Sequence, residues 1–198
     1  MLKSNVSWST NTDSYTQGKE AAKKAVVDLI QTKVAFLFTS VDCNVSKVLE
    51  GAKAELGTAP IIGCTSSAGI ITPDGFISSE NGFTGILALG DPELTVGVAS
   101  SPKKEEARLT GQMVAKEAMK KAGRTDSPAY FYMVASPAEE EDYIKGIEDV
   151  IGRVPIFGGS AADNTVEGKW SIYTNDQVFA DGVALAFLIS FISDSLSS

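Results

Sequence analysis

The sequence contains one pattern twice, at a spacing of 95 residues. Leu49–Ala68 reads LEGAKAELGTAPIIGCTSSA, and Ile144–Asp163 reads IKGIEDVIGRVPIFGGSAAD. The positions that coincide without a gap are Gly51, Gly57, Pro60, Ile61 and Gly63 with Gly146, Gly152, Pro155, Ile156 and Gly158. The flanking runs VAFLFTS and YFYMVAS also correspond, as do NGFTGILAL and DGVALAFLI. A duplicated unit usually builds one pseudo-symmetric body, so we expect the two small-residue loops to meet at one site.

The length of the chain suits one domain made of two such units. A chain of 198 residues can bury one sizeable core but is short for two independent ones. The turn Gly90-Asp91-Pro92 separates the units. We therefore expect a single domain over 1–198, with repeat halves at about 1–90 and 91–198.

The composition excludes several classes of function. The net charge is −8 and no basic run exceeds a Lys-Lys pair, which argues against nucleic acid as a partner. The chain has no histidine, so it can build neither a Ser-His-Asp triad nor a Cys-His pair. Its two cysteines, Cys43 and Cys64, are too few for a thiolate metal cage. We expect no metal and no cofactor.

The cellular context is predicted from what the sequence lacks. The N-terminal residues MLKSNVSWST contain no apolar signal-peptide core. The apolar run at Val183–Ile189 is far shorter than the roughly 20 residues that a membrane helix needs. Two free thiols are the simpler interpretation, although a Cys43–Cys64 disulfide stays open. We expect a cytoplasmic protein.

The periodicity of apolar residues predicts a mixed α/β sheet built from two β-α-β-α-β-β units. In the first unit, the expected helices have apolar stripes at Ala21–Ile30 and Val45–Leu56, the latter ending at Gly57. The expected strands are Val6–Ser9, Val34–Thr39, Pro60–Gly63 and Phe83–Leu89.

The second unit repeats this order with more strands at its end. A helix is expected over Glu105–Lys121, and a second follows Ser136-Pro137-Ala138-Glu139, which fits a capping box. The acidic run Glu139–Asp142 suits the first turn of that helix better than a metal site. The expected strands are Leu94–Ala99, Ala129–Val134, Pro155–Phe157, Trp170–Thr174, Gln177–Ala180 and Val183–Ile192.

The two loops that follow the short apolar strands are the candidate ligand-binding site. Glycines let a backbone approach a ligand closely, and neighbouring N–H and hydroxyl groups can bind a carboxylate or phosphate. The alternative is a tight turn in which only small residues fit. The candidate residues are Gly63, Cys64, Thr65, Ser66, Ser67, Gly158, Gly159, Ser160, Asp163 and Asn164.

Three of these residues have a second interpretation. Cys64 is a nucleophile if nearby N–H groups stabilise its thiolate, or a small buried thiol that fills space. Asp163 and Asn164 stand where the first unit has Ala68 and Gly69. They either bind the ammonium group of a ligand or are ordinary turn residues.

The motifs resemble those of a known family. IIGCTSSAGII at Ile61–Ile71, PIFGGSAAD at Pro155–Asp163 and VFADGVAL at Val178–Leu185 are similar to the N-terminal domain of FIST proteins. The resemblance implies a sensory module of signal-transduction proteins that binds small ligands, with amino acids suggested. A C-terminal FIST domain normally follows, and we expect it to be absent here. An edge strand near Ile189 would then lack its cover, which favours dimerisation.

Three hypotheses about function follow. The first is a non-enzymatic cytoplasmic sensor that binds an amino acid or small carboxylate at the two loops. The second is an enzyme that uses Cys64 for acyl transfer or hydrolysis. The third is a dimerisation or interaction module without a ligand. The expected partners are a small molecule, a second copy or a C-terminal FIST or signalling domain, and neither nucleic acid nor a membrane.

Overall fold

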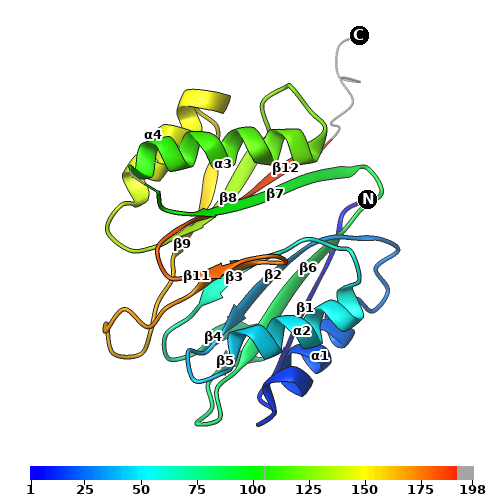
Figure 1. Cartoon of the computed structure of the whole chain (residues 1–198). Helices are drawn as coiled ribbons and strands as arrows, with labels where there is room; N and C mark the ends of the chain where they lie inside the picture. Colours follow the sequence, from blue (N-terminus) through cyan, green and yellow to red (C-terminus); the bar gives the residue numbers. More distant parts are fainter. Residues whose placement is uncertain (105, 191–198) are drawn as a thin grey trace.

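A computed structural model describes residues 1–104 and 106–190 of the chain. Within them the fold has four layers, in which two β-sheets lie face to face and a helix pair covers the outer face of each (Figure 1). The elements are β1 Lys3–Ser9, α1 Ser14–Ala25, β2 Thr32–Thr39, α2 Val45–Leu56, β3 Ile61–Thr65, β4 Ile70–Thr72, β5 Gly75–Ile77, β6 Thr84–Gly90, β7 Leu94–Pro102, α3 Ala107–Ala122, β8 Tyr130–Ala135, α4 Glu140–Ile151, β9 Ile156–Ser160, β10 Ile172–Thr174, β11 Val178–Phe179 and β12 Gly182–Ser190.

The sheets confirm the predicted mixed α/β class. The larger sheet has the order β1-β6-β2-β3-β10-β11, the smaller one β7-β12-β8-β9, and β4 pairs with β5 in a separate hairpin. The pairs β2–β3 and β8–β9 are parallel, and the other pairs are antiparallel. The hairpin β10–β11 follows β9 in the chain but joins the sheet of the first half.

The two halves use the same strand order and the same helix contact. Strands β1-β6-β2-β3 correspond in chain order to β7-β12-β8-β9. In each helix pair, glycines let the backbones touch. A Cβ would lie 2.1 Å from a carbonyl oxygen at Gly18 and 1.9 Å at Gly51, against 2.5 Å at Gly111 and 2.0 Å at Gly146. These parallels agree with a repeated unit, and its origin by duplication stays a prediction.

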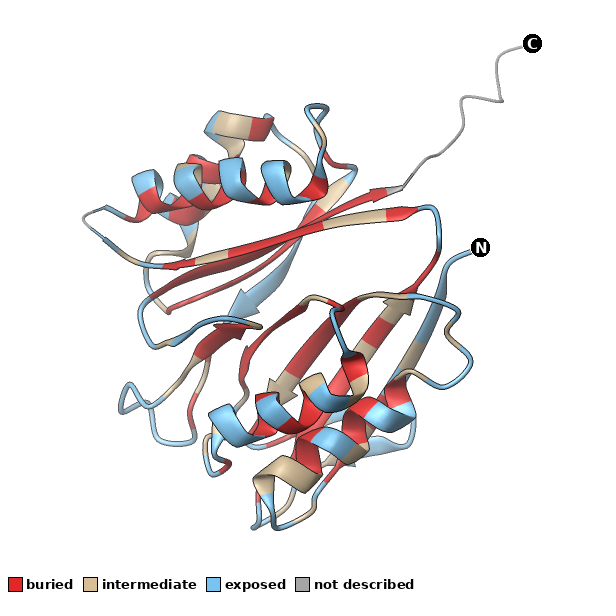
Figure 2. Cartoon of the chain, turned by 45° about the vertical axis from the view of Figure 1, so that its right-hand side comes forward, coloured by how far each residue is buried: buried red, intermediate tan, exposed pale blue. Residues whose placement is uncertain are grey.

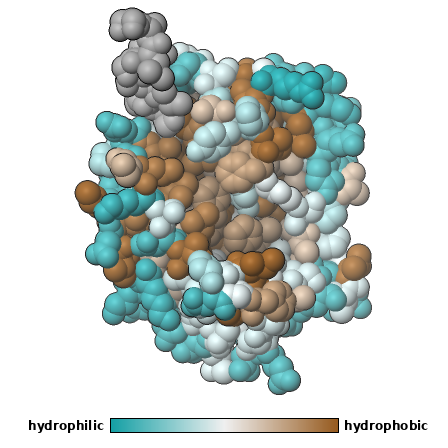
Figure 3. Space-filling view, turned by 180° about the vertical axis from the view of Figure 1, so that it is seen from behind, coloured by the Kyte–Doolittle hydropathy of each residue, from teal (hydrophilic) through white to brown (hydrophobic). Residues whose placement is uncertain are grey.

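The core forms three layers of buried side chains. One lies between α1–α2 and the first sheet, one between α3–α4 and the second sheet, and one between the two sheets (Figure 2). In the layer between the sheets, the rings of Phe36 and Tyr132 meet edge to face with centroids 4.7 Å apart. Such a pair adds about 0.5–1.5 kcal/mol to the burial of its area. Seen from behind, apolar side chains gather between the layers and are ringed by hydrophilic ones (Figure 3).

Helix termini follow the local sequence in the first half. Asp13 precedes α1 and its side chain accepts a hydrogen bond from the Thr16 N–H at 2.8 Å, while Asn44 caps α2 through the Lys47 N–H at 3.1 Å. Gly57 ends α2 with a φ of 61°, as predicted.

Two helix predictions were wrong at their ends. Helix α1 stops at Ala25, so Leu29 and Ile30 lie beyond it, and Ile30 is 84% exposed. The capping box before α4 does not form, because Ala138 has a φ of 86° and the helix begins after Glu139 without a side-chain cap. The Glu139 carboxylate instead accepts a hydrogen bond from Lys103 Nζ at 2.6 Å.

The strand ends also differ from the prediction. Strand β12 lies between β7 and β8, with Ile189 opposite Thr95, so the expected uncovered edge near Ile189 was wrong. Strand β10 begins at Ile172, after Trp170. The predicted start of a helix at Glu105, and the end of the last strand at Phe191 and Ile192, lie outside the described residues.

A membrane-spanning helix is not found within the described residues, where no helix combines the needed length and apolar character.

Candidate functional site

The two predicted loops lie against each other, where β3 and β9 end. The Ala162 N–H donates to the Thr65 carbonyl at 3.0 Å. The Ala68 N–H donates to Asn164 Oδ1 at 3.1 Å, and Asn164 Nδ2 donates to Asp42 at 3.1 Å. Asn164 thus connects the second loop to two segments of the first half.

A cavity of about 350 Å³ opens between the sheets where these loops meet. Its volume lies near the lower end of the range of small-molecule sites. It is lined by Phe38, Cys64, Thr65, Ser66, Tyr132, Val134, Phe157, Gly158, Gly159, Ser160 and Ala162.

The structure brings six of the ten candidate residues to this cavity. They are Cys64, Thr65, Ser66, Gly158, Gly159 and Ser160. Gly63 lies one position back, where a Cβ would stand 1.7 Å from the Leu37 carbonyl oxygen. Ser67, Asp163 and Asn164 do not line the cavity.

Asp163 organises its own loop. It is 5% exposed, and its carboxylate accepts hydrogen bonds from the backbone N–H groups of Thr165, Val166, Glu167 and Lys169. Burial on its own raises the pKa of Asp163, but these donors outweigh it and the pKa is lowered. The carboxylate is therefore ionised and already surrounded by donors, which leaves it little capacity for the ammonium group of a ligand.

The backbone N–H groups of the first loop are also occupied. The Thr65 N–H donates to the Ser171 carbonyl at 2.9 Å, and the Ser66 N–H donates to the Thr39 carbonyl at 3.0 Å. The expected cradle of free N–H groups for a carboxylate is not present at these positions, because the strand pairing and the contact between the loops consume them.

Cys64 is a neutral thiol. Its side chain is 4% exposed, and burial raises its pKa to about 12. Roughly one thiol in 100,000 is then ionised at pH 7, which argues against a nucleophilic role. Both Cys64 and Cys43 are free, so the disulfide left open by the sequence does not form. The Cys43 thiol instead donates to Gln17 Oε1 at 3.1 Å.

Tyr132 is the functional candidate that the sequence analysis missed. Tyr132 is 5% exposed and lines the cavity. Its hydroxyl makes no hydrogen bond within the described part of the chain but is not fully buried, whereas the Tyr143 hydroxyl is the one fully buried side-chain polar atom of that part without a partner. Burial raises the pKa of Tyr132 well above 10, so its hydroxyl stays protonated and can donate. The Phe157 ring lies 5.2 Å from the Tyr132 ring, centroid to centroid, and completes an aromatic wall.

The signal for Tyr132 was present but weak. It interrupts the apolar run Tyr130–Ala135 with a polar atom at a position where the first unit has Phe36. A buried phenol needs a partner, so such a substitution between repeats marks a place to look for one.

A search against family profiles matches the FIST N domain over residues 33–194. The chain belongs to the FIST N domain family. Domains of this type are sensory parts of signalling proteins. No curated protein sequence matches the chain.

Among solved structures, this FIST N domain is similar to a cyanuric acid hydrolase from A. caulinodans. The sequences are 11% identical, and the TM-score is 0.49 over 100% of this chain and 69% of that chain. A likeness at this level has no bearing on the activity of the FIST N domain.

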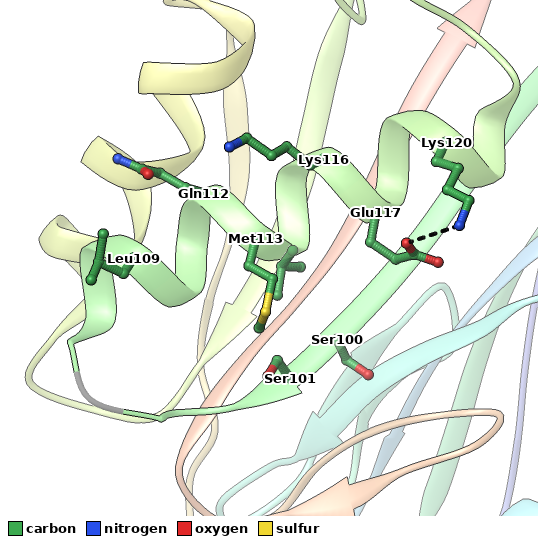
Figure 4. Close-up of a pocket in the computed structure, with 9 residues that line it drawn as sticks. Ser100, Ser101, Leu109, Gln112, Met113, Lys116, Glu117 and Lys120 are labelled. Carbon is green, nitrogen blue, oxygen red and sulfur yellow. Dashed lines mark ion pairs between the residues drawn. The ribbon is translucent and has the colours of Figure 1, made fainter.

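A second hollow of the FIST N domain, of about 550 Å³, runs between α3 and the edge strand β7 (Figure 4). Met113 reaches over Ser101 there, and Glu117 pairs with Lys120 at 4.0 Å. Leu109 is 52% exposed and Met113 38%, so a ligand in this groove would keep much of its contact with water. It contains none of the predicted loop residues.

Metal ligands do not cluster within the described residues of the FIST N domain. Over residues 1–104 and 106–190, no three His, Cys, Asp or Glu side chains are grouped so that they could hold an ion.

Proposed function

We propose that this domain senses a small molecule bound in the cavity between the two loops. The observation that carries the proposal is the Tyr132 hydroxyl, which lies in the wall of the cavity and makes no hydrogen bond to the described residues. A ligand acceptor directed to this hydroxyl would gain a hydrogen bond with a net contribution of about 0.5–1.5 kcal/mol. On the β3 side of the cavity, the Thr65 and Ser66 N–H groups already have partners.

The lining indicates the class of ligand. Phe38, Tyr132 and Phe157 offer ring surfaces, and the cavity has no charged side chain in its wall. A ligand with a flat or branched apolar body suits these surfaces, with one acceptor group directed to the Tyr132 hydroxyl. The wall offers neutral donors for a carboxylate but no anionic side chain for an ammonium group, so a small aryl carboxylate fits better than an amino acid does.

The position of the cavity suits signalling. Its walls come from both sheets, with Cys64 on β3 and Gly159 on β9. A ligand that contacts both walls binds one relative placement of the two halves more tightly than others. Such a difference in affinity between two conformations is what a conformational signal requires. The catalytic alternative through Cys64 is disfavoured by the high pKa of that thiol.

The test is a thermal-shift screen against amino acids and small carboxylates, followed by calorimetric titration of each hit. Ligand at 100 times its dissociation constant adds about 2.7 kcal/mol of stability, which raises Tm by several degrees in a domain of this size. Tyr132→Phe removes only the free hydroxyl and should weaken binding about tenfold. Tyr143 of α4 lies in the core of the second half, where its hydroxyl has no hydrogen-bond partner among the described residues. Tyr143→Phe is therefore the matched control and should leave binding unchanged.

Two outcomes contradict the proposal. One is a screen in which no compound of the panel raises the Tm. The other is a hit whose affinity is the same in the wild type and in Tyr132→Phe, which would place binding elsewhere.

A further inference from the structure

The outer edge of β9 pairs with no strand within residues 1–104 and 106–190. Strand β9 ends its sheet, and all of its residues from Ile156 to Ser160 are exposed. Phe131 N–H donates to the Pro155 carbonyl at 3.1 Å, and Ala161 N–H donates to the Ala135 carbonyl at 2.9 Å. Because donors alternate along a strand, this pairing turns the N–H groups of Ile156, Gly158 and Ser160 away from β8.

The corresponding edge of β3 is fully paired. Gly63 stands opposite Tyr173 of β10, and the Thr65 N–H donates to the Ser171 carbonyl at 2.9 Å. The Ile61 N–H donates to Asn175 Oδ1 at 2.6 Å. The Tyr173 ring covers Gly63, with one ring carbon 3.0 Å from where a Cβ would be. The strand that covers this edge comes from the connection between β9 and β12 in the other half.

The equivalent connection in the first half carries the hairpin β4–β5. Its sequence Ile70-Ile71-Thr72 parallels Ile172-Tyr173-Thr174 of β10. Strand β4 pairs with β5 alone among the described residues. Ile71 is 89% exposed and stands across from Phe76, which is 63% exposed, whereas Tyr173 is fully buried. Among the described residues, the β4–β5 hairpin and the β9 edge therefore both lack the partner that their counterparts β10–β11 and β3 find in each other.

We propose that the edge of β9 takes the β4–β5 hairpin of a second copy of this chain. The strand adds antiparallel, in the register that β10 has on β3, so Ile71 of one copy lies opposite Gly158 of the other. The order β9-β4-β5 then repeats the order β3-β10-β11. Pro73 follows Thr72 where Asn175 follows Thr174, so the added pairing ends at Thr72.

Head-to-tail contact follows from this arrangement. Each copy carries both the β4–β5 hairpin and the β9 edge, so two copies can exchange hairpins and close into a dimer with two equal contacts. An open edge strand is otherwise a template for uncontrolled pairing, and closure removes it. With a net charge of −8 on each copy, repulsion opposes the contact, so added salt strengthens it.

The test measures solution mass by light scattering and sedimentation from micromolar to millimolar concentration. The wild type should move from 20.8 kDa towards twice that mass, and at a lower concentration in high salt than in low salt. Ile71→Asp places a charge in the contact and should raise the dissociation constant more than about tenfold. Ile30→Asp is the matched control, since Ile30 is 84% exposed and far along the chain from either element.

A charge-swap variant keeps the test specific. In the proposed register Ile71 and Ile156 are diagonal neighbours, so Ile156→Lys in the same chain as Ile71→Asp should restore association. A monomer at every concentration would overturn the proposal, and any partner of the β9 edge would then be a different protein. A dimer that Ile71→Asp and Ile30→Asp weaken equally would also overturn it.

Discussion

Strands β3 and β9 occupy the same place in the two halves but have opposite environments. Each lies parallel to its neighbour and places a glycine, Gly63 or Gly158, against a carbonyl oxygen of that neighbour. All residues of β3 are buried, whereas all residues of β9 are exposed. The difference comes from β10, which the second half supplies to the first and which has no counterpart on β9 among the described residues. The environment of a strand is thus decided by a remote hairpin as much as by its own residues.

The largest expected contrast is in thiol reactivity. Cys64 on β3 corresponds to Gly159 on β9, where a Cβ would meet no atom within 4 Å. Gly159→Cys should therefore place an accessible thiol with an ordinary pKa on β9. Because the pKa of Cys64 is about 12, the new thiol should be alkylated roughly a thousandfold faster at pH 8.

Mass spectrometry of iodoacetamide-treated protein, with unfolded protein as the reference, measures this ratio. Equal rates at the two positions would contradict the contrast between the strands.

The next contrast is in stability. An alanine Cβ would lie 1.7 Å from the Leu37 oxygen at Gly63 and 1.8 Å from the Met133 oxygen at Gly158. Strand β3 is held on both sides and cannot shift, so Gly63→Ala should cost about 4 kcal/mol or more. Strand β9 can move outward, so Gly158→Ala should cost about 2 kcal/mol, including its strained φ of +146°. Urea unfolding gives both values, and equal losses would mean that β9 is as constrained as β3.

Two buried tyrosines offer a smaller contrast. The Tyr173 hydroxyl donates to the carbonyls of Cys64 at 2.7 Å and Leu37 at 3.2 Å, so Tyr173→Phe should cost about 1–2 kcal/mol. The Tyr132 hydroxyl has no such partner in the described part of the chain, so Tyr132→Phe should change the free energy of unfolding by less than about 0.5 kcal/mol. A large loss in Tyr132→Phe, measured by the same unfolding experiment without ligand, would show that the hydroxyl is already paired.

The smallest expected effect concerns acid stability of the second loop. The pKa of Asp163 is lowered in the folded protein, so its contribution is complete above the unfolded value, about 3.9, and is lost as the pH falls towards the folded value. Asp163→Asn should therefore destabilise the protein at pH 7 and flatten the loss of stability below about pH 4. Asp74→Asn, at an exposed turn, is the control. If the free energy of unfolding of Asp163→Asn falls below about pH 4 as steeply as that of the wild type, this role of Asp163 is contradicted.

Much of the fold follows from short-range patterns. Apolar runs such as Val34–Thr39 and glycines such as Gly57 determine local structure, so they predicted strands and a helix end correctly. The repeat also predicted that the two loops belong together, because equivalent strand ends approach each other in a pseudo-symmetric body.

The rest depends on contacts distant in sequence. Ile172–Thr174 reads as a strand, but its residues do not reveal that it joins the sheet of the other half. Asp163 reads equally well as a ligand or a turn residue, and only the loop conformation brings four N–H groups to its carboxylate. Tyr132 has the sequence context of a core residue, because the sequence does not reveal whether a single hydroxyl in an apolar run has a hydrogen-bond partner.

The most direct test of the shared ligand site is an NMR titration of labelled protein with the amino-acid and small-carboxylate panel. We expect at least one compound to shift the amide signals of both Cys64–Ser66 and Gly158–Ser160, with one common dissociation constant for the two loops. If no compound moves both sets, or if the shifts gather along α3 beside Met113, the two loops do not form one site.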